Sequence, residues 1–370
     1  MTSIVDSIFN IISFINIDIN ILLLFAIVIP GLVLFIIMAL NVMISVYFER
    51  KVAAFMQDRL GPMEVGIFGY KGGKKFWGGI GQIFADTVKL LTKEDIMPAN
   101  ADKVLMLISP FIIVAGALLT FIGIPFSDGL IVSDFNIGIL YIIAMSSVGV
   151  IGVILAGWSS NNKWSLYGAM RSAAQIISYE IPIGLTLLLI VIVCGSLQVS
   201  DIVQWQADNR WFIFHSPFTF IAFFIYFISV VAETNRTPFD IPEAESELVA
   251  GWMTEFSGFK WSIFFMSEYA NMLIVSLVAS FVFLGGWLSP FTIFNVFPDS
   301  WLILDGFYIG IFWISIKAIF LIFVMMWFRW TFPRLRVDQL MYVCWKVFIP
   351  FSLANLFFVT IWELIAGAIS

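Results

Sequence analysis

An acidic stretch at residues 231–258 is the part of this sequence best suited to proton chemistry. It reads VAETNRTPFDIPEAESELVAGWMTEFSG and follows a long apolar run. It has a single cation, Arg236, and its carboxylates are Glu233, Asp240, Glu243, Glu245, Glu247 and Glu255. Carboxylates crowded at low dielectric resist ionising together, so some of them should hold a proton near neutral pH. Helix capping could explain two of these acids, whereas six beside a membrane favour a proton relay.

Three further ionisable residues interrupt apolar runs. Glu180 lies in SYEIP (178–182), Glu268 in SEYAN (267–271) and Lys317 in SIKAI (315–319). A charge inside a membrane costs roughly 2.5 kcal/mol or more, so each needs a partner, water or a neutral state. We favour a functional role over structural pairing for the two glutamates, and both explanations stay open for the lysine.

Helices in a membrane must position these residues. The chain has 370 residues, of which 61% are hydrophobic and only 12% are charged, whereas soluble domains are about a quarter charged. The apolar runs are continuous and of helix length, unlike the alternating pattern of a membrane barrel. The sequence therefore predicts an all-α polytopic membrane protein, a single integral membrane domain over residues 1–370. We expect no cleavable signal peptide, because residues 1–20 hold Asp6 and Asp18 but no Lys or Arg.

About eight transmembrane helices are expected, with a short interfacial helix at residues 1–18. The spans lie at about residues 20–47, 104–125, 137–158, 174–197, 216–233, 262–286, 307–330 and 341–366. The loops after the odd-numbered spans hold the basic residues Arg50, Lys51, Arg59, Lys71, Lys74, Lys75, Lys89, Lys93, Lys103, Lys163, Arg171, Arg236, Lys260, Arg329, Arg334 and Arg336. In the other loops Arg210 is the one firm cation. The positive-inside rule then puts the basic loops in the cytoplasm and both termini in the periplasm.

Two cytoplasmic loops are expected to contain helices of their own. The long first loop, residues 48–103, has apolar residues at helical spacing, namely Ile80, Ile83, Phe84, Val88 and Leu91. Opposite them lie Gln82, Asp86, Lys89 and Lys93, a pattern that predicts an amphipathic helix in the membrane interface or against a soluble partner. The acidic loop, residues 233–261, should begin a short helix at Pro242, with Glu243 and Glu247 on one face.

Cysteine and histidine are too few for a redox centre on this chain. The two cysteines are Cys194 and Cys344, and the one histidine is His215. Iron–sulfur clusters and zinc sites usually take four ligands, so we expect no metal site. Both cysteines lie in apolar runs and are expected to be packing residues.

Eight short motifs resemble the H-subunit family of NADH:quinone oxidoreductase, the respiratory complex I. They are ERK (49–51), MQDRLGP (56–62), FADTVKLLTKE (84–94), SYE (178–180), AETNRTPFD (232–240), EAESELVAG (243–251), MSEYAN (266–271) and PRLRVDQLM (333–341). They span nearly the whole chain in family order. The chain departs from the family at Met63, in a Gly/Lys-rich run near residues 69–79, and at Trp252 and Met253.

The resemblance implies an eight-helix membrane protein that closes a narrow quinone cavity against a peripheral arm. Carried over by position, the quinone-binding residues would be Arg50, Phe55, Gln57, Arg59, Arg236 and Phe239. The proton relay would be Glu49, Asp86, Glu180, Glu233, Asp240, Glu243, Glu245, Glu247, Glu255 and Glu268. A quinone such as ubiquinone would be the substrate, and NADH, FMN and iron–sulfur clusters would belong to partner subunits. Those partners would be peripheral quinone-module subunits on the cytoplasmic side, and small and antiporter-like membrane subunits laterally, with no nucleic acid.

We therefore expect a non-redox subunit of a proton-pumping NADH:quinone oxidoreductase in the bacterial inner membrane, with no complete active site of its own. A homologous membrane anchor of a hydrogenase-type or ferredoxin-driven quinone reductase is the nearest alternative. A stand-alone proton-coupled transporter would normally show internal repeats and broken helices, and the chain has no clear duplication. A pure scaffold would leave Glu180 and Glu268 unexplained.

Overall fold

The computed structural model describes residues 19–63, 65, 79–242, 245–290 and 307–369. Within these ranges every regular element is a helix, which confirms the predicted fold class. The interfacial helix predicted at residues 1–18 lies outside the described residues, as does Glu243.

The helices follow the predicted order along the chain. They are α2 (Ile19–Met56), α4 (Gly81–Thr92), α5 (Lys103–Ile122), α6 (Gly138–Ser159), α7 (Lys163–Cys194), α8 (Val199–Asp208), α9 (Phe212–His215), α10 (Pro217–Glu233), α11 (Glu245–Leu248), a 3₁₀ turn (Gly251–Met253), α12 (Gly258–Phe283), α13 (Phe307–Thr331), α14 (Val337–Tyr342), a π-helical stretch (Val343–Phe348) and α15 (Ile349–Ile369). The short helices α8 and α9 in the loop before α10 were not predicted.

Each of the eight predicted spans coincides with a helix. Among the described residues, seven helices are long and apolar enough to cross a membrane, the last running from α14 into α15. The eighth, α10, is apolar but has only 17 residues. Two boundaries were wrong: α2 continues to Met56 instead of ending near residue 47, and α7 begins at Lys163 instead of near residue 174.

Local capping explains several of these boundaries. Asn162 accepts a hydrogen bond from the backbone N–H of Trp164 and caps the start of α7. The first residues of this helix are polar, which explains why the sequence predicted a loop there. Ser216 and Thr219 form a capping box at the start of α10, where Pro217 fills the first turn. The φ of +77° at Gly195, a conformation that glycine adopts freely, ends α7. No such local signal marks the extension of α2 beyond residue 47, which brings Glu49 into the helix.

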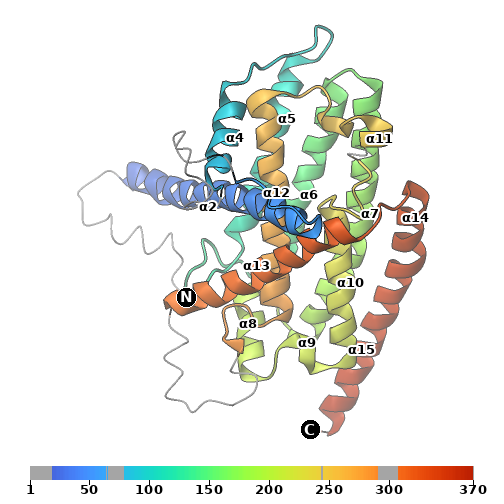
Figure 1. The fold of residues 1–370 in the computed structure, drawn as a ribbon. Coiled ribbons are helices and arrows are strands. Elements are labelled where there is room, and N and C mark those ends of the chain that lie inside the picture. Colours follow the sequence, from blue (N-terminus) through green and yellow to red (C-terminus); the bar gives the residue numbers. More distant parts are fainter. Residues whose placement is uncertain (1–18, 64, 66–78, 243–244, 291–306, 370) are drawn as a thin grey trace.

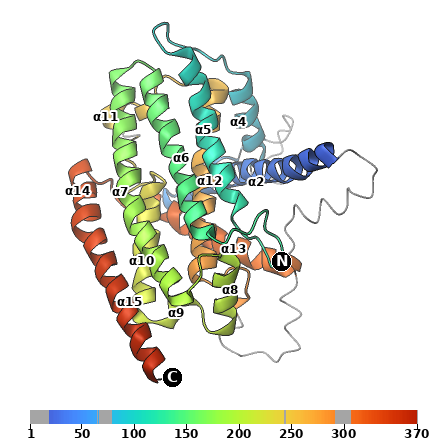
Figure 2. The same cartoon turned by 180° about the vertical axis from the view of Figure 1, so that it is seen from behind.

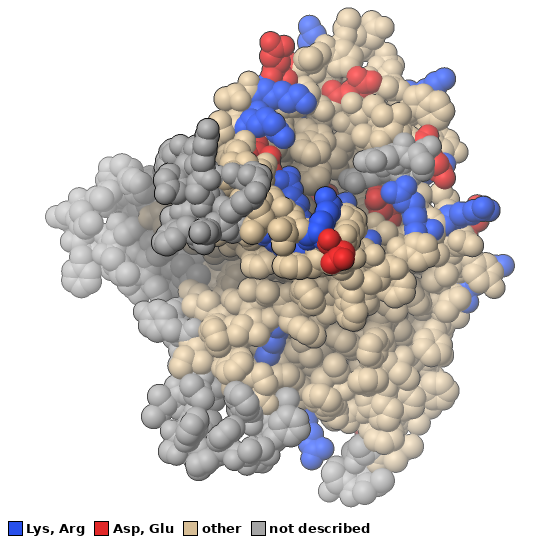
Figure 3. All heavy atoms as spheres, in the orientation of Figure 1, with Lys and Arg blue, Asp and Glu red and all other residues tan. Residues whose placement is uncertain are grey.

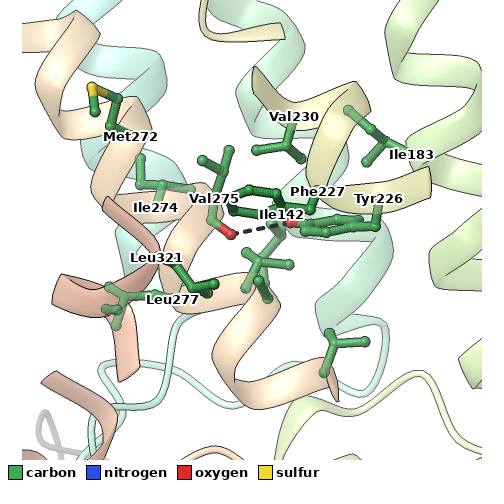
Figure 4. Packing of buried hydrophobic residues seen from close by; sticks show 14 of the residues in the cluster. Ile142, Ile183, Tyr226, Phe227, Val230, Met272, Ile274, Val275, Leu277 and Leu321 are labelled. Carbon is green, nitrogen blue, oxygen red and sulfur yellow. Dashed lines mark hydrogen bonds between the residues drawn. The ribbon is translucent and has the colours of Figure 1, made fainter. Parts of the chain in front are cut away.

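The long helices α5, α6, α7 and α12 run side by side, and α2 and α13 cross them at a steep angle (Figures 1 and 2). Helix α12 lies at the centre of the bundle, and nearly all of its second half is therefore buried. Figure 4 shows the apolar layer that α10 and α12 form with their neighbours, including Tyr226, Ile274 and Leu277. The Tyr226 hydroxyl donates to the carbonyl of Val275 at 3.3 Å, which gives this buried polar group a partner inside the layer.

The two ends of the bundle differ in charge. Helices α4 and α11 lie at one end, and α8, α9 and the C-terminus lie at the other (Figures 1 and 2). On the face in Figure 3, acidic and basic side chains gather over the α4 and α11 end, and the opposite half is nearly uncharged. The described basic loops thus share one end, as the sequence predicts; that this end faces the cytoplasm stays a prediction.

The amphipathic helix predicted in the first loop is confirmed as α4. Gln82 and Asp86 of its polar face are partly buried, whereas Lys89 and Lys93 are exposed. Asp86 forms an ion pair with Arg50 of α2, whereas Phe84, Val88 and Leu91 form an exposed apolar stripe. In the acidic loop Pro242 lies in a turn, and a short helix, α11, is described from Glu245 to Leu248. Because residues 243–244 are outside the described residues, the start of this helix at Pro242 stays a prediction.

Close packing of α7 generates a prediction at Gly168. A Cβ there would lie 2.7–2.8 Å from backbone atoms of Gly251 and Trp252, which cannot move aside as a flexible side chain could. We expect Gly168→Ala to destabilise the protein by about 1–3 kcal/mol, measured as a lower melting temperature of the purified complex. Gly184→Ala on the same helix is the control, because nothing lies within 4 Å of its added carbon. Equal melting temperatures for the two variants would contradict this account of the contact.

Candidate functional site

A buried arginine joins two carboxylates at the centre of the charged end. Arg236, in the loop after α10, donates from Nη1 to both Glu49 carboxylate oxygens, at 3.0 and 3.2 Å. Its Nε lies 2.9 Å from Oε1 of Glu268. Arg236 and Glu49 are only 3% and 5% exposed. This arginine therefore links α2, α12 and the acidic loop through one planar group, and Lys could not reproduce that geometry.

Two further side chains complete the cluster around Glu49. The hydroxyl of Tyr269 donates to Oε2 at 2.5 Å, and Arg329 of α13 forms an ion pair with Oε1. The guanidinium of Arg236 also lies 4.4 Å from the centre of the Tyr269 ring. Glu49, Glu268, Arg236 and Arg329 carry equal numbers of opposite formal charges, which is the condition for holding ions in a region of low dielectric.

Opposing effects act on Arg236 itself, which lies in a loop outside the spans. Burial alone would lower the pKa of its guanidinium, but Glu268 and Glu49 together hold that pKa well above its usual range. Arg236 therefore stays charged at every physiological pH. Any proton that moves through the cluster must be carried by the other groups.

Asp240 forms a second ion pair beside this cluster. Its Oδ2 lies 3.0 Å from Nη2 of Arg334, and the backbone N–H of Leu335 donates to the carbonyl of Pro238 at 3.0 Å. Burial raises the pKa of Asp240, and Arg334 and Arg329 oppose that rise without cancelling it. Asp240 consequently takes up a proton more readily than an exposed aspartate does.

The acidic loop is held in place by backbone contacts rather than by its own helix. Gln175 of α7 donates from Nε2 to the carbonyls of Ala232, at 2.7 Å, and Phe239, at 2.8 Å. The ring of Phe239 is buried beside that of Tyr179, with 5.8 Å between ring centres. Gln175 thus satisfies one carbonyl of the last turn of α10 and one of the acidic loop, and ties both to α7.

A cavity of about 80 Å³, the polar cavity, extends the cluster toward α6 and α7; its walls are mostly apolar, and its polar lining comes from two acids, two asparagines and hydroxyl groups. Glu233 and Glu268 both line it, together with Asn235, Asn271 and Ser146. Two carboxyl groups from different helices therefore face one small enclosed space. A cavity of this size and polarity can hold several water molecules.

Glu180 lies beyond this cavity, on α7. Its Oε1 accepts a hydrogen bond from the hydroxyl of Ser147 on α6. Glu180 and Glu233 are close enough to interact electrostatically. The described acids therefore form a series from Glu49 through Glu268 and Glu233 to Glu180.

An apolar crevice and a second cavity with charged groups in its wall adjoin the cluster on its other side. The crevice, of about 280 Å³, lies between α2, α4 and α12, with the Arg50–Asp86 ion pair in its wall. A second cavity, of about 620 Å³, is lined by Glu49, Tyr269 and three arginines, Arg50, Arg59 and Arg329. Val46, Arg50, Pro62 and Phe265 line both, so the two spaces adjoin and share a wall. An apolar chain in the crevice could thus present a polar head to Glu49 and Tyr269.

Not all of the predicted site residues meet in this cluster. Arg236 and Phe239 lie in the protein core and line neither of these two spaces, and Phe55 and Gln57 are exposed at the end of α2. Glu247 pairs with Arg171 at the surface, and Glu255 accepts a hydrogen bond from Asn162 at the α6–α7 turn. Glu243 and the side chain of Glu245 lie outside the described residues.

Sequence reasoning missed four residues of the site. Arg329 and Arg334 were counted only as loop charges, although the motif PRLRVDQLM (333–341) contains Arg334. Tyr269 follows Glu268 directly, and an aromatic hydroxyl beside a buried acid is a detectable signal. Gln175 lies between Arg171 and Glu180 in the chain, but no spacing rule predicts which carbonyls it would reach.

Lys317, for which two explanations were open, has structural partners. Its ammonium donates to the carbonyls of Leu284, Gly286 and Leu288 at 2.7–2.8 Å. It also lies 4.1 Å from the centre of the Trp211 ring. The lysine thus ties α13 to the end of α12, and it is 12 residues, or about 18 Å of helix, from Arg329.

Comparison with known proteins agrees with the motifs. A family model described as NADH dehydrogenase matches residues 29–360. The chain belongs to this family. The H subunit of NADH-quinone oxidoreductase from Chlorobaculum tepidum is 51% identical over 322 residues, or 86% of this chain and 87% of that protein. Its counterpart in Bacteroides thetaiotaomicron is 47% identical over 326 residues, covering 86% and 85%, and that of Magnetococcus marinus is 47% identical over 311 residues, covering 84% and 83%.

The charge cluster of this NADH dehydrogenase family member generates a prediction at Arg236. Lys in its place has all of its donors on one nitrogen and cannot span the two carboxylates that Arg236 contacts through Nη1 and Nε, which leaves one of them poorly compensated. We expect Arg236→Lys to cost about 3–5 kcal/mol of stability, measured as loss of assembled complex on a native gel and a lower melting temperature. Arg210→Lys, at an exposed arginine of the opposite end, is the matched control. Full assembly of Arg236→Lys would show that the double ion pair is not required.

Proposed function

We propose that this chain is the membrane subunit of an NADH:quinone oxidoreductase that forms part of the quinone cavity and couples quinone reduction to proton movement. One observation carries the proposal: an apolar crevice leads to a buried cluster of acids that continues through a polar cavity. The names of its relatives support the same assignment. The chain would supply no redox group, and NADH, FMN and iron–sulfur clusters would be bound by partner subunits.

The two adjoining spaces suit the two parts of a quinone. The crevice between α2, α4 and α12 has mainly apolar walls, which match a hydrocarbon tail. The neighbouring cavity offers Arg59, Arg329 and Tyr269, whose N–H and O–H groups can donate hydrogen bonds to quinone oxygens. Quinone would therefore enter beside α4 and place its head group near Glu49.

Proton coupling would follow from the charge balance of the cluster. A quinone that accepts two electrons becomes a strong base, so neighbouring carboxyl groups can supply or redistribute protons. A change at Glu49 would be felt at Glu268 through Arg236, and from there at Glu233 and Glu180. Each unit of pKa change corresponds to about 1.4 kcal/mol, so a coupled series can transmit several kcal/mol.

The surfaces around the site suit two kinds of partner subunit in a bacterial inner membrane. The charged end with α4 and α11 would face the cytoplasm and the peripheral quinone-module subunits, following the positive-inside rule. Small and antiporter-like membrane subunits would lie beside the bundle and continue the path from Glu180. A homologous hydrogenase-type anchor would share the charge cluster, and the names of the relatives favour the NADH-linked complex.

Glu180→Gln tests the coupling role. The amide keeps the size of the side chain and its bond to Ser147 but cannot carry a proton. In assembled complexes we expect quinone reduction and proton translocation to fall by about tenfold or more, whereas NADH:ferricyanide reduction persists. Glu255→Gln is the control, because that acid faces Asn162 away from the polar cavity. Wild-type quinone reduction and pumping in Glu180→Gln would overturn the relay.

Ala39→Trp tests the quinone crevice. The added ring would fill part of the space between α2 and α12, because Ala39 lines it. We expect the KM for quinone to rise about tenfold, equivalent to about 1.4 kcal/mol of lost binding, while NADH:ferricyanide reduction stays unchanged. Leu40→Trp, one residue away on an exposed face of the same helix, should leave the KM unchanged. Equal KM values for both variants would place the quinone elsewhere.

A further inference from the structure

We propose that Asn235 is a positioning residue of the relay, whose side-chain oxygen orients water between Glu233 and Glu268. The inference rests on the proposed function, because it assigns a role within the same proton path. The sequence alone did not predict Asn235 as a site residue. Its place in the wall of the cavity that both acids line, and the way in which its side chain is held, carry the argument.

The backbone and one hydrogen bond fix the direction of this side chain. Asn235 has a φ of +52°, in the left-handed region that Asn tolerates better than most residues. Its Nδ2 donates to the hydroxyl of Ser172 on α7 at 3.1 Å. Ser172 is fully buried, so this contact has no competition from solvent. With Nδ2 held by α7, Oδ1 on the other branch of the amide must point away from Ser172.

The oxygen that results is a buried acceptor without a protein donor. Oδ1 of Asn235 has very little accessible surface and accepts no hydrogen bond from any residue that the structure describes. Asn235 lines the polar cavity of about 80 Å³ together with Glu233 and Glu268. One water needs about 10–15 Å³ of such space, so the cavity has room for several waters. Water in this cavity can donate a hydrogen bond to Oδ1, which a buried acceptor requires.

A water oriented in this way can pass a proton between the two acids. A proton that reaches the Glu268 carboxylate makes it a carboxyl. The water then accepts that proton and gives one of its own protons to the carboxylate of Glu233. One carboxyl becomes a carboxylate, the other becomes a carboxyl, and the water is unchanged, so atoms and charge balance. Asn235 itself exchanges no proton. Its oxygen holds one O–H bond of the water and thereby directs the other O–H bond toward the receiving carboxylate.

A purely structural role for Asn235 makes a different prediction. If the residue were required only for the turn, any side chain that tolerates φ near +50° would replace it. Glycine adopts this conformation freely but has no side-chain oxygen. Asn235→Gly therefore separates the turn from the hydrogen bond.

The experiment uses the complete complex in membrane vesicles. Asn235→Gly should assemble and keep wild-type NADH:ferricyanide reduction, while proton translocation coupled to quinone reduction falls by about tenfold to a hundredfold. The solvent deuterium isotope effect on quinone reduction should increase, because proton transfer becomes rate-limiting. Ser172→Ala, which keeps the asparagine but frees its amide, should shift both quantities in the same direction by a smaller factor.

Asn161→Gly is the matched control. Asn161 also has a positive φ, +49°, but it lies exposed at the α6–α7 turn, so this variant should behave as wild type. Wild-type pumping and isotope effect in Asn235→Gly, in a preparation where Glu180→Gln abolishes pumping, would overturn the role of Asn235 and leave the proposed function standing. Should Asn235→Gly fail to assemble, Ser172→Ala decides alone, and a wild-type isotope effect there overturns the inference. Wild-type quinone reduction and proton translocation in Glu180→Gln would instead overturn the proposed function.

Discussion

Burying Arg236 between Glu49 and Glu268 constrains the whole molecule, because an ion in a region of low dielectric must have its partner in place. Glu49 and Arg236 are separated by 187 positions in the chain, and Arg329 comes later still in the sequence, in α13. Helices α2, α12 and α13 and the acidic loop must therefore converge at one point. Each of these elements is held there by charges that it cannot satisfy alone.

The steep crossing of α2 and α13 follows from the same requirement (Figures 1 and 2). Helices upright in the bundle would leave Glu49 and Arg329 at the rim, close to the ends of their spans. Crossing helices carry these ends over the bundle to Tyr269 and Arg236 instead. Aliphatic and aromatic side chains of α10 and α12 (Figure 4) fill the layer between the cluster and the opposite end. The series of acids consequently runs across the bundle, to Glu180 on α7.

Ionisable residues in different parts of the bundle show how context decides between function and structure. Glu180 is hydrogen-bonded to Ser147 and has an electrostatic neighbour in Glu233, whereas Lys317 has three carbonyls that satisfy its ammonium fully. The lysine is thus locked between two helices. The glutamate has one hydroxyl donor, on the neighbouring helix α6, and a second acid close by.

The sequence by itself determined the helical membrane fold, the order of the spans, the amphipathic α4 and the family, because hydropathy and short motifs are local properties. It also marked Glu49, Glu180, Glu233 and Glu268 as residues to explain. Only the tertiary structure decided that Glu255 lies apart from the cluster, that Arg236 lies in the core, and that Arg329, Tyr269 and Asn235 belong to the site. Those facts depend on contacts between residues distant in the chain, and hydropathy periodicity carries no information about which helices meet or at what angle.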